Sequence, residues 1–171
     1  MYRLIYSTIL LLIYASFSSC IREKTVFNYE INNAEFVSDD MVFEGSNTLQ
    51  LKYMPQLAQA AGISTLTEDQ IISVKLTKAT LSTEDSMHFD NINSITLQLS
   101  TDKTDMQEIA VISPVSENSD QLNMTVSAET DVAEAFKQKE IYLIADIDVK
   151  QDQTMPIHFK AALVFEITIK K

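Results

Sequence analysis

The sequence predicts a mainly β protein: an antiparallel two-layer β-sandwich, immunoglobulin-like or related, with two short helices in the connections. Three observations predict this fold. Apolar and polar residues alternate in several short segments, clusters of Asp, Asn and Ser separate these segments, and two further segments have a helical pattern. Alternation with period two is typical of strands that bury one face, and many such strands with polar turns favour two packed layers.

The expected strands follow one another along most of the chain. They lie at residues 25–31, 34–43, 48–54, 72–81, 95–99, 109–111, 122–126, 141–149 and 157–169. Asn32 and Asn33 separate the first two of them. Leu76 to Ala79 is an odd step in the apolar alternation, so we expect a bulge or a strand break there.

The strongest strand signal lies in the last third of the chain. Apolar residues keep period two over 141–149 and again over 157–169, with a polar turn at 151–153 between the two segments. The pattern predicts that 141–169 forms two adjacent antiparallel strands at the centre of the sandwich. The core residues expected from them are Leu143, Ile147, Phe159, Leu163 and Phe165.

Two short helices are expected in the connections. Residues 55–61 start with Pro55, which suits a first helical position, and Gly62 suits the position past the end. Residues 130–139 carry acidic residues early and Lys137 and Lys139 late, in agreement with the helix dipole.

The first residues have the pattern of a secretory leader. Arg3 is followed by an apolar segment at 4–17 and by small residues up to Cys20, the single cysteine of the chain. A spanning helix needs about 18–20 apolar residues, so this segment is too short to be one. We expect a signal peptide at 1–19, a lipidated cysteine and short tether at 20–26, and a single β-sandwich domain at 27–171.

Ser18, Ser19 and Cys20 resemble the lipobox of bacterial lipoproteins, with Phe17 where that family usually has Leu or another aliphatic residue. The resemblance implies cleavage before Cys20 by a dedicated signal peptidase and a lipid anchor on its thiol. In the sorting rule of well-studied lipoproteins, Asp at the next position favours the inner membrane. Ile21 therefore implies the outer membrane, on the periplasmic side by default, with surface display as the alternative.

Composition excludes several function classes. The chain of 171 residues has 24 acidic and 13 basic residues and a net charge of −11, which argues against nucleic acid as a partner. Gly45 and Gly62 are its only glycines, so a glycine-rich phosphate loop cannot be built. With one cysteine, no disulfide can form within the chain. No cofactor is expected.

Candidate catalytic and metal-binding residues are few. The two histidines, His88 and His158, lack metal-ligand spacing and are expected to be exposed surface residues. Asp146 and Asp148 share a strand face and are weak candidates for a hydrolase pair or a cation site, but the sequence favours a solvated face, because no nearby loop supplies further oxygen ligands in a recognisable order. The looser acidic group of Asp102, Asp105 and Glu108 has the same ambiguity. We therefore expect no catalytic residues and no metal site.

Two groups of residues are candidate interaction or modification sites. Tyr29, Tyr53 and Tyr142 could form a sugar-binding platform if they are exposed, but would more often be half-buried in a sandwich. Asp85-Ser86-Met87 resembles the Asp-Ser/Thr-apolar O-glycosylation motif that some Gram-negative gut bacteria use on exported proteins. The resemblance makes Ser86 a candidate O-glycosylation site.

Three function classes follow, in order of preference. The first is a non-enzymatic cell-envelope lipoprotein that acts as a binding or assembly module, with the membrane as a partner through Cys20 and an unknown envelope protein or glycan as the other. The second is a carbohydrate-binding or glycan-uptake accessory lipoprotein. The third is a hydrolase that uses Asp146 and Asp148.

Overall fold

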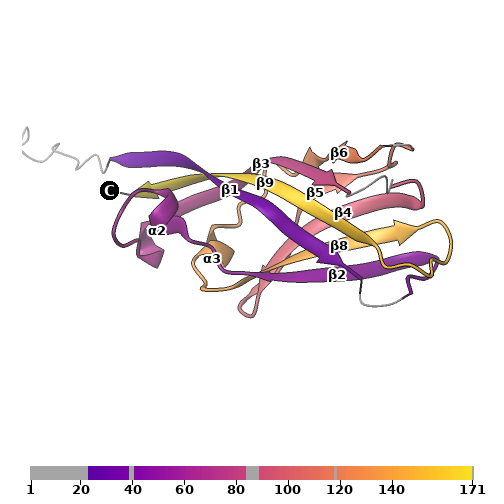
Figure 1. Cartoon of the computed structure of the whole chain (residues 1–171). Coiled ribbons are helices and arrows are strands. Elements are labelled where there is room, and N and C mark those ends of the chain that lie inside the picture. Colours follow the sequence, from indigo (N-terminus) through magenta and orange to yellow (C-terminus); the bar gives the residue numbers. More distant parts are fainter. Residues whose placement is uncertain (1–22, 39–40, 84–88, 118, 171) are drawn as a thin grey trace, which may run out of the picture.

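The protein is a β-sandwich of two antiparallel sheets with short helices at one end, which confirms the predicted fold class (Figure 1). The computed structural model describes residues 23–38, 41–83, 89–117 and 119–170. Among them, no helix combines the length and the apolar character needed to cross a membrane.

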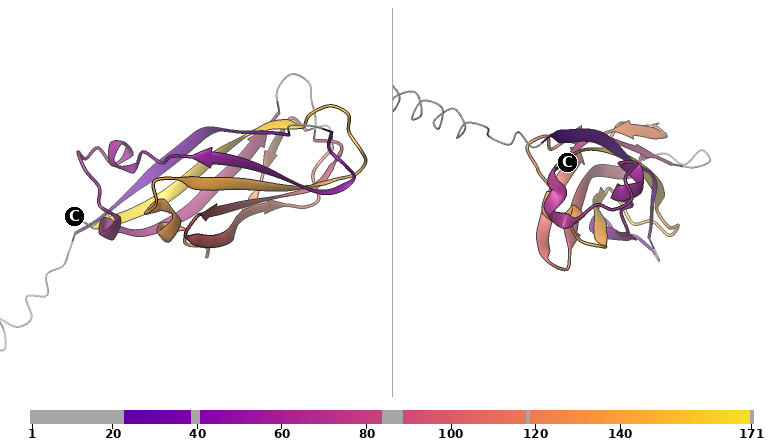
Figure 2. Two further views of the ribbon diagram at one scale, coloured as in Figure 1. Left: turned by 90° about the horizontal axis from the view of Figure 1, so that it is seen from below. Right: turned by 90° about the vertical axis from the view of Figure 1, so that its left-hand side faces the viewer.

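The four-stranded sheet has the strand order β1-β9-β3-β6. Its strands are β1 (Lys24–Val37), β9 (His158–Lys170), β3 (Ile71–Ser82) and β6 (Gln121–Asn123). The first and last strands are neighbours, because Lys24 pairs with Lys170 and Val37 with His158. Both ends of the described chain therefore lie at the same end of the molecule (Figure 2).

The five-stranded sheet has the strand order β2-β8-β4-β5-β7. Its strands are β2 (Gly45–Tyr53), β8 (Ile141–Val149), β4 (Ile92–Thr101), β5 (Thr104–Ile112) and β7 (Thr125–Val126). The alternating residues predicted to be apolar and inward, such as Leu97 and Leu99, are buried between the two sheets.

Strands β8 and β9 do not pair with each other, so the predicted terminal hairpin is wrong. β8 lies between β2 and β4 in one sheet, and β9 lies between β1 and β3 in the other. Residues 150–157 lead from one layer to the other, and Gln153 forms an isolated bridge with Val42 on the way. Alternation shows which face of a strand is buried but not which strand lies beside it. The core set was nevertheless right, since each of these residues is buried: Leu143, Ile147, Phe159, Leu163 and Phe165.

The first strand also differs from its prediction. Residues 24–37 form one strand, and the expected break at Asn32 and Asn33 is a register shift within it, between Ile31 and Ala34. The strand begins at Lys24, so three residues assigned to the tether belong to the sheet. In β3, the predicted irregularity is confirmed as a register shift between Leu76 and Lys78.

The segment predicted as one strand at 122–126 is divided between the sheets. β6 pairs with β3 in the four-stranded sheet, whereas β7 pairs with β5 in the five-stranded sheet. Met124 lies between them and is buried, and its backbone N–H donates a hydrogen bond to the Ala79 carbonyl. The alternating residues Leu122, Met124 and Val126 were identified correctly, but the two halves of the segment belong to different sheets.

The helices are shorter than predicted and lie at one end of the sandwich. They are α2 (Leu57–Ala60), the 3-10 helix η1 (Glu68–Gln70) and α3 (Ala133–Phe136). We call this the helical end: residues 55–70 and 130–140 with the start of β1 and the end of β9 (Figure 1). We call the opposite end the loop end; it includes residues 41–44 and 150–157.

Candidate functional site

Several predicted site residues lie outside the described residues. These are the proposed lipidation site Cys20, the candidate glycosylation site Ser86 and His88. His158 is described and lies on the outer face of the four-stranded sheet, where its Nε2 is 2.6 Å from Oε1 of Glu35. The His158 side chain is half-buried rather than exposed as predicted, and it has an acidic partner that lies far from it in the sequence.

Asp146 and Asp148 lie on the outer face of the five-stranded sheet, where both are half-buried. Asp146 accepts hydrogen bonds from Thr48 Oγ1 at 2.6 Å and Gln98 Nε2 at 3.0 Å, and Asp148 accepts one from Asn93 Nδ2 at 3.0 Å. These donors come from the flanking strand β2 and from β4. The carboxylates thus take part in cross-strand polar contacts of a sheet surface.

The other acidic candidates are on the β4–β5 hairpin. Asp102 accepts a hydrogen bond from the Tyr142 hydroxyl at 3.1 Å, and Glu108 accepts one from Ser127 Oγ at 3.3 Å. Asp105 is exposed. Within the described residues, no group of three or more His, Cys, Asp or Glu side chains could hold a metal ion.

The three tyrosines do not share a surface. Tyr29 is buried, and its hydroxyl lies 3.0 Å from that of Tyr53, whose ring is packed against the core. Burial, followed by the Tyr53 hydrogen bond, raises the pKa of Tyr29 to about 12. Tyr142 is on the outer face of the five-stranded sheet, and its hydrogen bond to Asp102 raises its pKa. A sugar-binding pair of exposed tyrosines is therefore absent from this trio.

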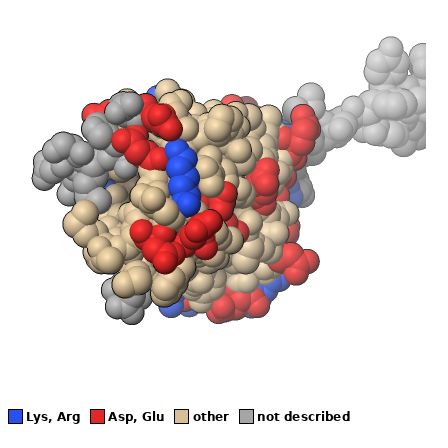
Figure 3. Space-filling view, turned by 90° about the vertical axis from the view of Figure 1, so that its right-hand side faces the viewer, with Lys and Arg blue, Asp and Glu red and all other residues tan. Residues whose placement is uncertain are grey.

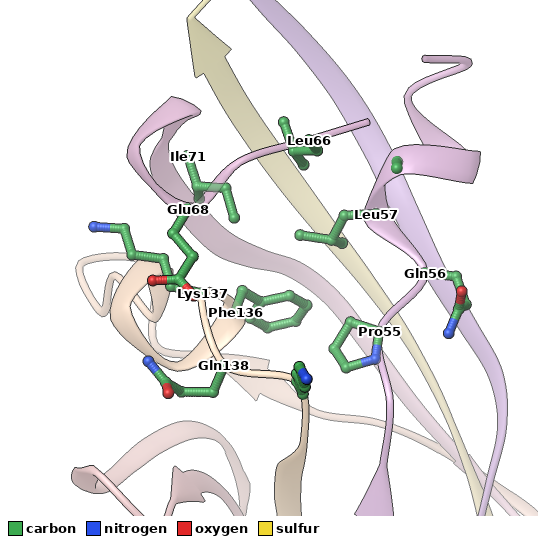
Figure 4. A pocket seen from close by; sticks show the side chains of 11 residues that line it. Pro55, Gln56, Leu57, Leu66, Glu68, Ile71, Phe136, Lys137 and Gln138 are labelled. Atoms are coloured by element: carbon green, nitrogen blue, oxygen red, sulfur yellow. The ribbon is translucent and has the colours of Figure 1, made fainter. Parts of the chain in front are cut away.

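A hollow at the helical end was not expected from the sequence. It has a volume of about 280 Å³ and is formed by the segment around α2, by η1 and by α3. Figure 4 shows Pro55, Leu57 and Phe136 turned toward one another inside it. The full lining is Pro55, Gln56, Leu57, Ala58, Leu66, Glu68, Ile71, Phe136, Lys137, Gln138 and Lys139.

Local sequence explains how α2 forms one wall of this hollow. Its single turn ends where Gly62 takes a φ of +66°, a left-handed conformation that favours glycine. The Gly62 amide donates to the Gln59 carbonyl at 3.1 Å, and that of Ile63 donates to the Ala58 carbonyl at 3.0 Å. Gly62 therefore lies past the end of the helix as predicted, whereas Pro55 lies two residues before Leu57 and not at the first helical position.

Asp131 joins α3, which forms the opposite wall of the hollow, to strand β3. Its Oδ1 accepts hydrogen bonds from the Val74 amide of β3 at 2.9 Å and from the Ala133 amide of α3 at 3.0 Å. Burial alone would raise the pKa of Asp131, but these hydrogen bonds, one from Ser73 and the charge of Lys75 outweigh burial and lower it. A carboxylate thus joins a helix start to a sheet strand.

A second hollow of about 320 Å³ shares the rim of the first. Its lining adds the turn of the β4–β5 hairpin and Glu140 to residues 137–139. Glu140 also pairs with Lys52 of β2, with an Nζ to Oε2 distance of 2.7 Å. Neither lining contains a histidine or a cysteine. The helical end thus has an apolar floor with a rim of mixed charge.

Comparison with known proteins finds a likeness in structure alone. No protein-family model matches the chain, and no curated protein matches it. Among solved structures, the chain is similar to one in "Structure of infectious bursal disease virus Gx strain", with a TM-score of 0.44 and 12% identity. The match covers 86% of this chain and 33% of the other, so this chain spans about a third of that length. A likeness at this level carries no argument about fold or function.

Proposed function

We propose that the protein is a non-enzymatic cell-envelope lipoprotein whose β-sandwich is a binding or assembly module, held at the outer membrane by lipid on Cys20. The observation that carries the proposal is the leader that ends at Cys20, the single cysteine of the chain. Periplasmic exposure is the default, and surface display is the alternative that the experiment below distinguishes.

The position of β1 supports this arrangement. The sheet begins at Lys24, four residues after Cys20, and an extended chain of that length reaches about 14 Å at most. A lipid on Cys20 would therefore keep the start of β1, and with it the helical end, next to the membrane. The loop end would point away from the bilayer. A module held in this way presents one end to partners.

The geometry of the candidate residues supports a non-enzymatic role. Asp146 and Asp148 accept hydrogen bonds from neighbouring strands on the outer face of the sheet. His158 is paired with Glu35 on the outer face of the other sheet. A carbohydrate-binding role would need an exposed tyrosine pair, and the Tyr29 hydroxyl is instead engaged with Tyr53 and Gln56.

The anchor is tested with Cys20→Ser in the full-length chain. We expect the variant to lose labelling by radioactive palmitate and to leave the membrane fraction. Phe17→Leu is the matched control, because it restores the aliphatic residue usual in the lipobox and should keep both labelling and fractionation. Labelling and membrane association that persist in Cys20→Ser would refute the proposal.

Two further measurements test the orientation and the absence of activity. Protease treatment of intact cells degrades the protein if it is displayed on the surface and spares it if it faces the periplasm. The purified protein, screened against glycan, peptide and ester substrates, should show no turnover. Turnover that is lost in Asp146→Asn or Asp148→Asn would replace this proposal with a carboxylate-based hydrolase.

A further inference from the structure

The loop end carries a group of exposed apolar side chains. Val37 is 50% exposed, Met41 48%, Phe43 61% and Met155 68%. These four make up half of the large exposed apolar residues in the described part of the chain. Single exposed apolar residues are common, but a group of them on neighbouring segments is typical of a contact surface.

The backbone beneath this group is held in place by hydrogen bonds. Val42 and Gln153 exchange two of them, with N to O distances of 3.0 and 2.7 Å. The Ser38 amide donates to the Ile157 carbonyl at 3.0 Å, and the Ile157 amide donates to Ser38 Oγ at 2.9 Å. Val42 and Ile157 are buried. The backbone is thus held by hydrogen bonds and by the burial of Val42 and Ile157, and the side chains of Met41, Phe43 and Met155 are exposed to solvent.

A groove of about 430 Å³ starts at this group and follows the edge of the five-stranded sheet. Val37 and Met41 line it, together with the consecutive residues 47–50 of β2. In the strand order, β2 is an edge strand that pairs with β8 alone. Its register with β8 runs without a shift from Gly45 to Tyr53, whereas the other long edge strand, β1, contains the irregularity at Ile31.

A regular edge strand beside an apolar groove is suited to pairing with one more strand. The outer edge of β2 offers backbone amides and carbonyls that a partner in extended conformation can satisfy. Alternate side chains of such a partner would point into the groove and contact Val37 and Met41. The shape therefore selects an extended segment rather than a helix.

The charge around the groove selects the chemistry of that segment. Among the described residues of 37–50 and 148–157, Lys150 is the single basic residue, and three are acidic: Glu44, Asp148 and Asp152. Lys150 is engaged with Glu117, at an Nζ to Oε1 distance of 3.5 Å. Figure 3 shows acidic residues gathered around surface without charged side chains on this end, with a stripe of positive charge between them. A basic partner complements this surface, and a second copy of this acidic chain would be repelled.

We propose that the groove along β2 binds an extended, basic and apolar segment of another protein, which adds a strand to the five-stranded sheet. The inference rests on the proposed function and deepens it, because it names the surface and the partner chemistry of the binding module. It also agrees with the anchor, since the helical end is the one tied to the membrane and the loop end is free to meet a partner.

The probe is a short synthetic peptide that alternates valine with lysine, added to the lipid-anchored protein purified in detergent. We expect binding that weakens as salt is raised, and slower backbone hydrogen exchange at residues 46–50. A peptide that alternates valine with glutamate should bind at least roughly tenfold more weakly. N-methylation of the lysine peptide removes its backbone donors and should abolish the protection of β2.

Variants locate the site. Val37→Ser with Met41→Ser should weaken binding of the lysine peptide by roughly tenfold, because the apolar contacts are lost without a change of charge. Met106→Ser is the matched control, since Met106 is 56% exposed on β5 and lies outside the groove. Glu44→Gln with Asp152→Asn should reduce the salt dependence.

Three outcomes would overturn the inference. They are equal binding of the glutamate peptide, equal binding by the Val37→Ser and Met41→Ser protein, and self-association of the protein through this surface in sedimentation experiments. Because membrane fractionation of Cys20→Ser is a separate measurement, failure of the groove leaves the anchor proposal standing, and failure of the anchor leaves the peptide result interpretable.

Discussion

The helical end and the loop end of the sandwich differ in the apolar side chains that they leave exposed to solvent. At the helical end, the Phe136 ring packs against Phe165 at a centroid distance of 4.9 Å and against Tyr29 at 6.2 Å. At the loop end, backbone hydrogen bonds between residues 42 and 153 join two loops, and Met41, Phe43 and Met155 face solvent.

The difference distinguishes side chains that stabilise the fold from side chains that are free to contact a partner. Burial of an aromatic side chain removes apolar surface from water and stabilises the fold, whereas an exposed apolar side chain adds little to stability and can contact a partner. Substitutions of buried side chains at the helical end should therefore change the free energy of unfolding, and substitutions of the exposed apolar side chains at the loop end should leave it nearly unchanged. The following predictions test this contrast, from the largest expected effect to the smallest.

Phe136→Ala should have the largest effect. Its ring is buried between two aromatic neighbours, and truncation of such a residue lowers the free energy of unfolding by about 3–5 kcal/mol. Urea unfolding followed by circular dichroism measures the change. Lys139→Ala, on the exposed rim of the same hollow, is the control and should have little effect. Equal stability of wild type and Phe136→Ala would show that α3 is not part of the cooperative unit.

Asp131→Ala should have an intermediate effect. It leaves the Val74 and Ala133 amides without their acceptor, which costs about 1–3 kcal/mol. Because the pKa of Asp131 is lowered in the folded state, its contribution is present above the ordinary Asp pKa and is lost as pH falls through the folded value. The difference between wild type and Asp131→Ala should thus shrink in acid. A difference that is the same at neutral and acid pH would contradict this account, and exposed Asp105→Ala is the control.

Phe43→Ser should have the smallest effect, within about 0.5 kcal/mol, because exposed side chains away from special features contribute little to stability. Phe89→Ser gives the matched comparison. Phe89 is buried, and its ring lies 6.1 Å from that of Phe159. Both variants replace phenylalanine by serine, so their thermal unfolding compares the same substitution at an exposed and at a buried position. A large loss in Phe43→Ser would mean that this ring serves the fold rather than an interaction.

Much of the fold follows from alternation, and its limits are physical. The period of two identified most strands and the inward residues of β8 and β9, because burial of one face imposes that pattern directly. Strand partners depend on contacts far apart in sequence, so alternation could not place β8 and β9 in different sheets. For the same reason it could not show that the chain changes layers at Met124.

The candidate surfaces were harder to predict than the fold. The alternation predicts Met41 and Phe43 in a strand at 34–43, but β1 ends at Val37. Without the contacts of the folded chain, exposed apolar residues of a loop cannot be told from buried residues of a strand. A usable signal was the acidic residues Asp39, Asp40 and Glu44 on either side of them. The hollow at the helical end forms where α2 and α3 come together. Strands β3 to β7 separate these helices in the sequence, so no local pattern could predict the hollow.

The central position of β9 has a consequence for the order in which the protein can fold. β1 and β3 do not touch in the strand order, and β9 alone joins them. The four-stranded sheet therefore cannot assemble until the last strand arrives, and its closure depends on contacts of very high sequence separation, which is typical of slow folding. Until then β1 has an unpaired edge on each side, and such edges can pair with strands of other chains during folding.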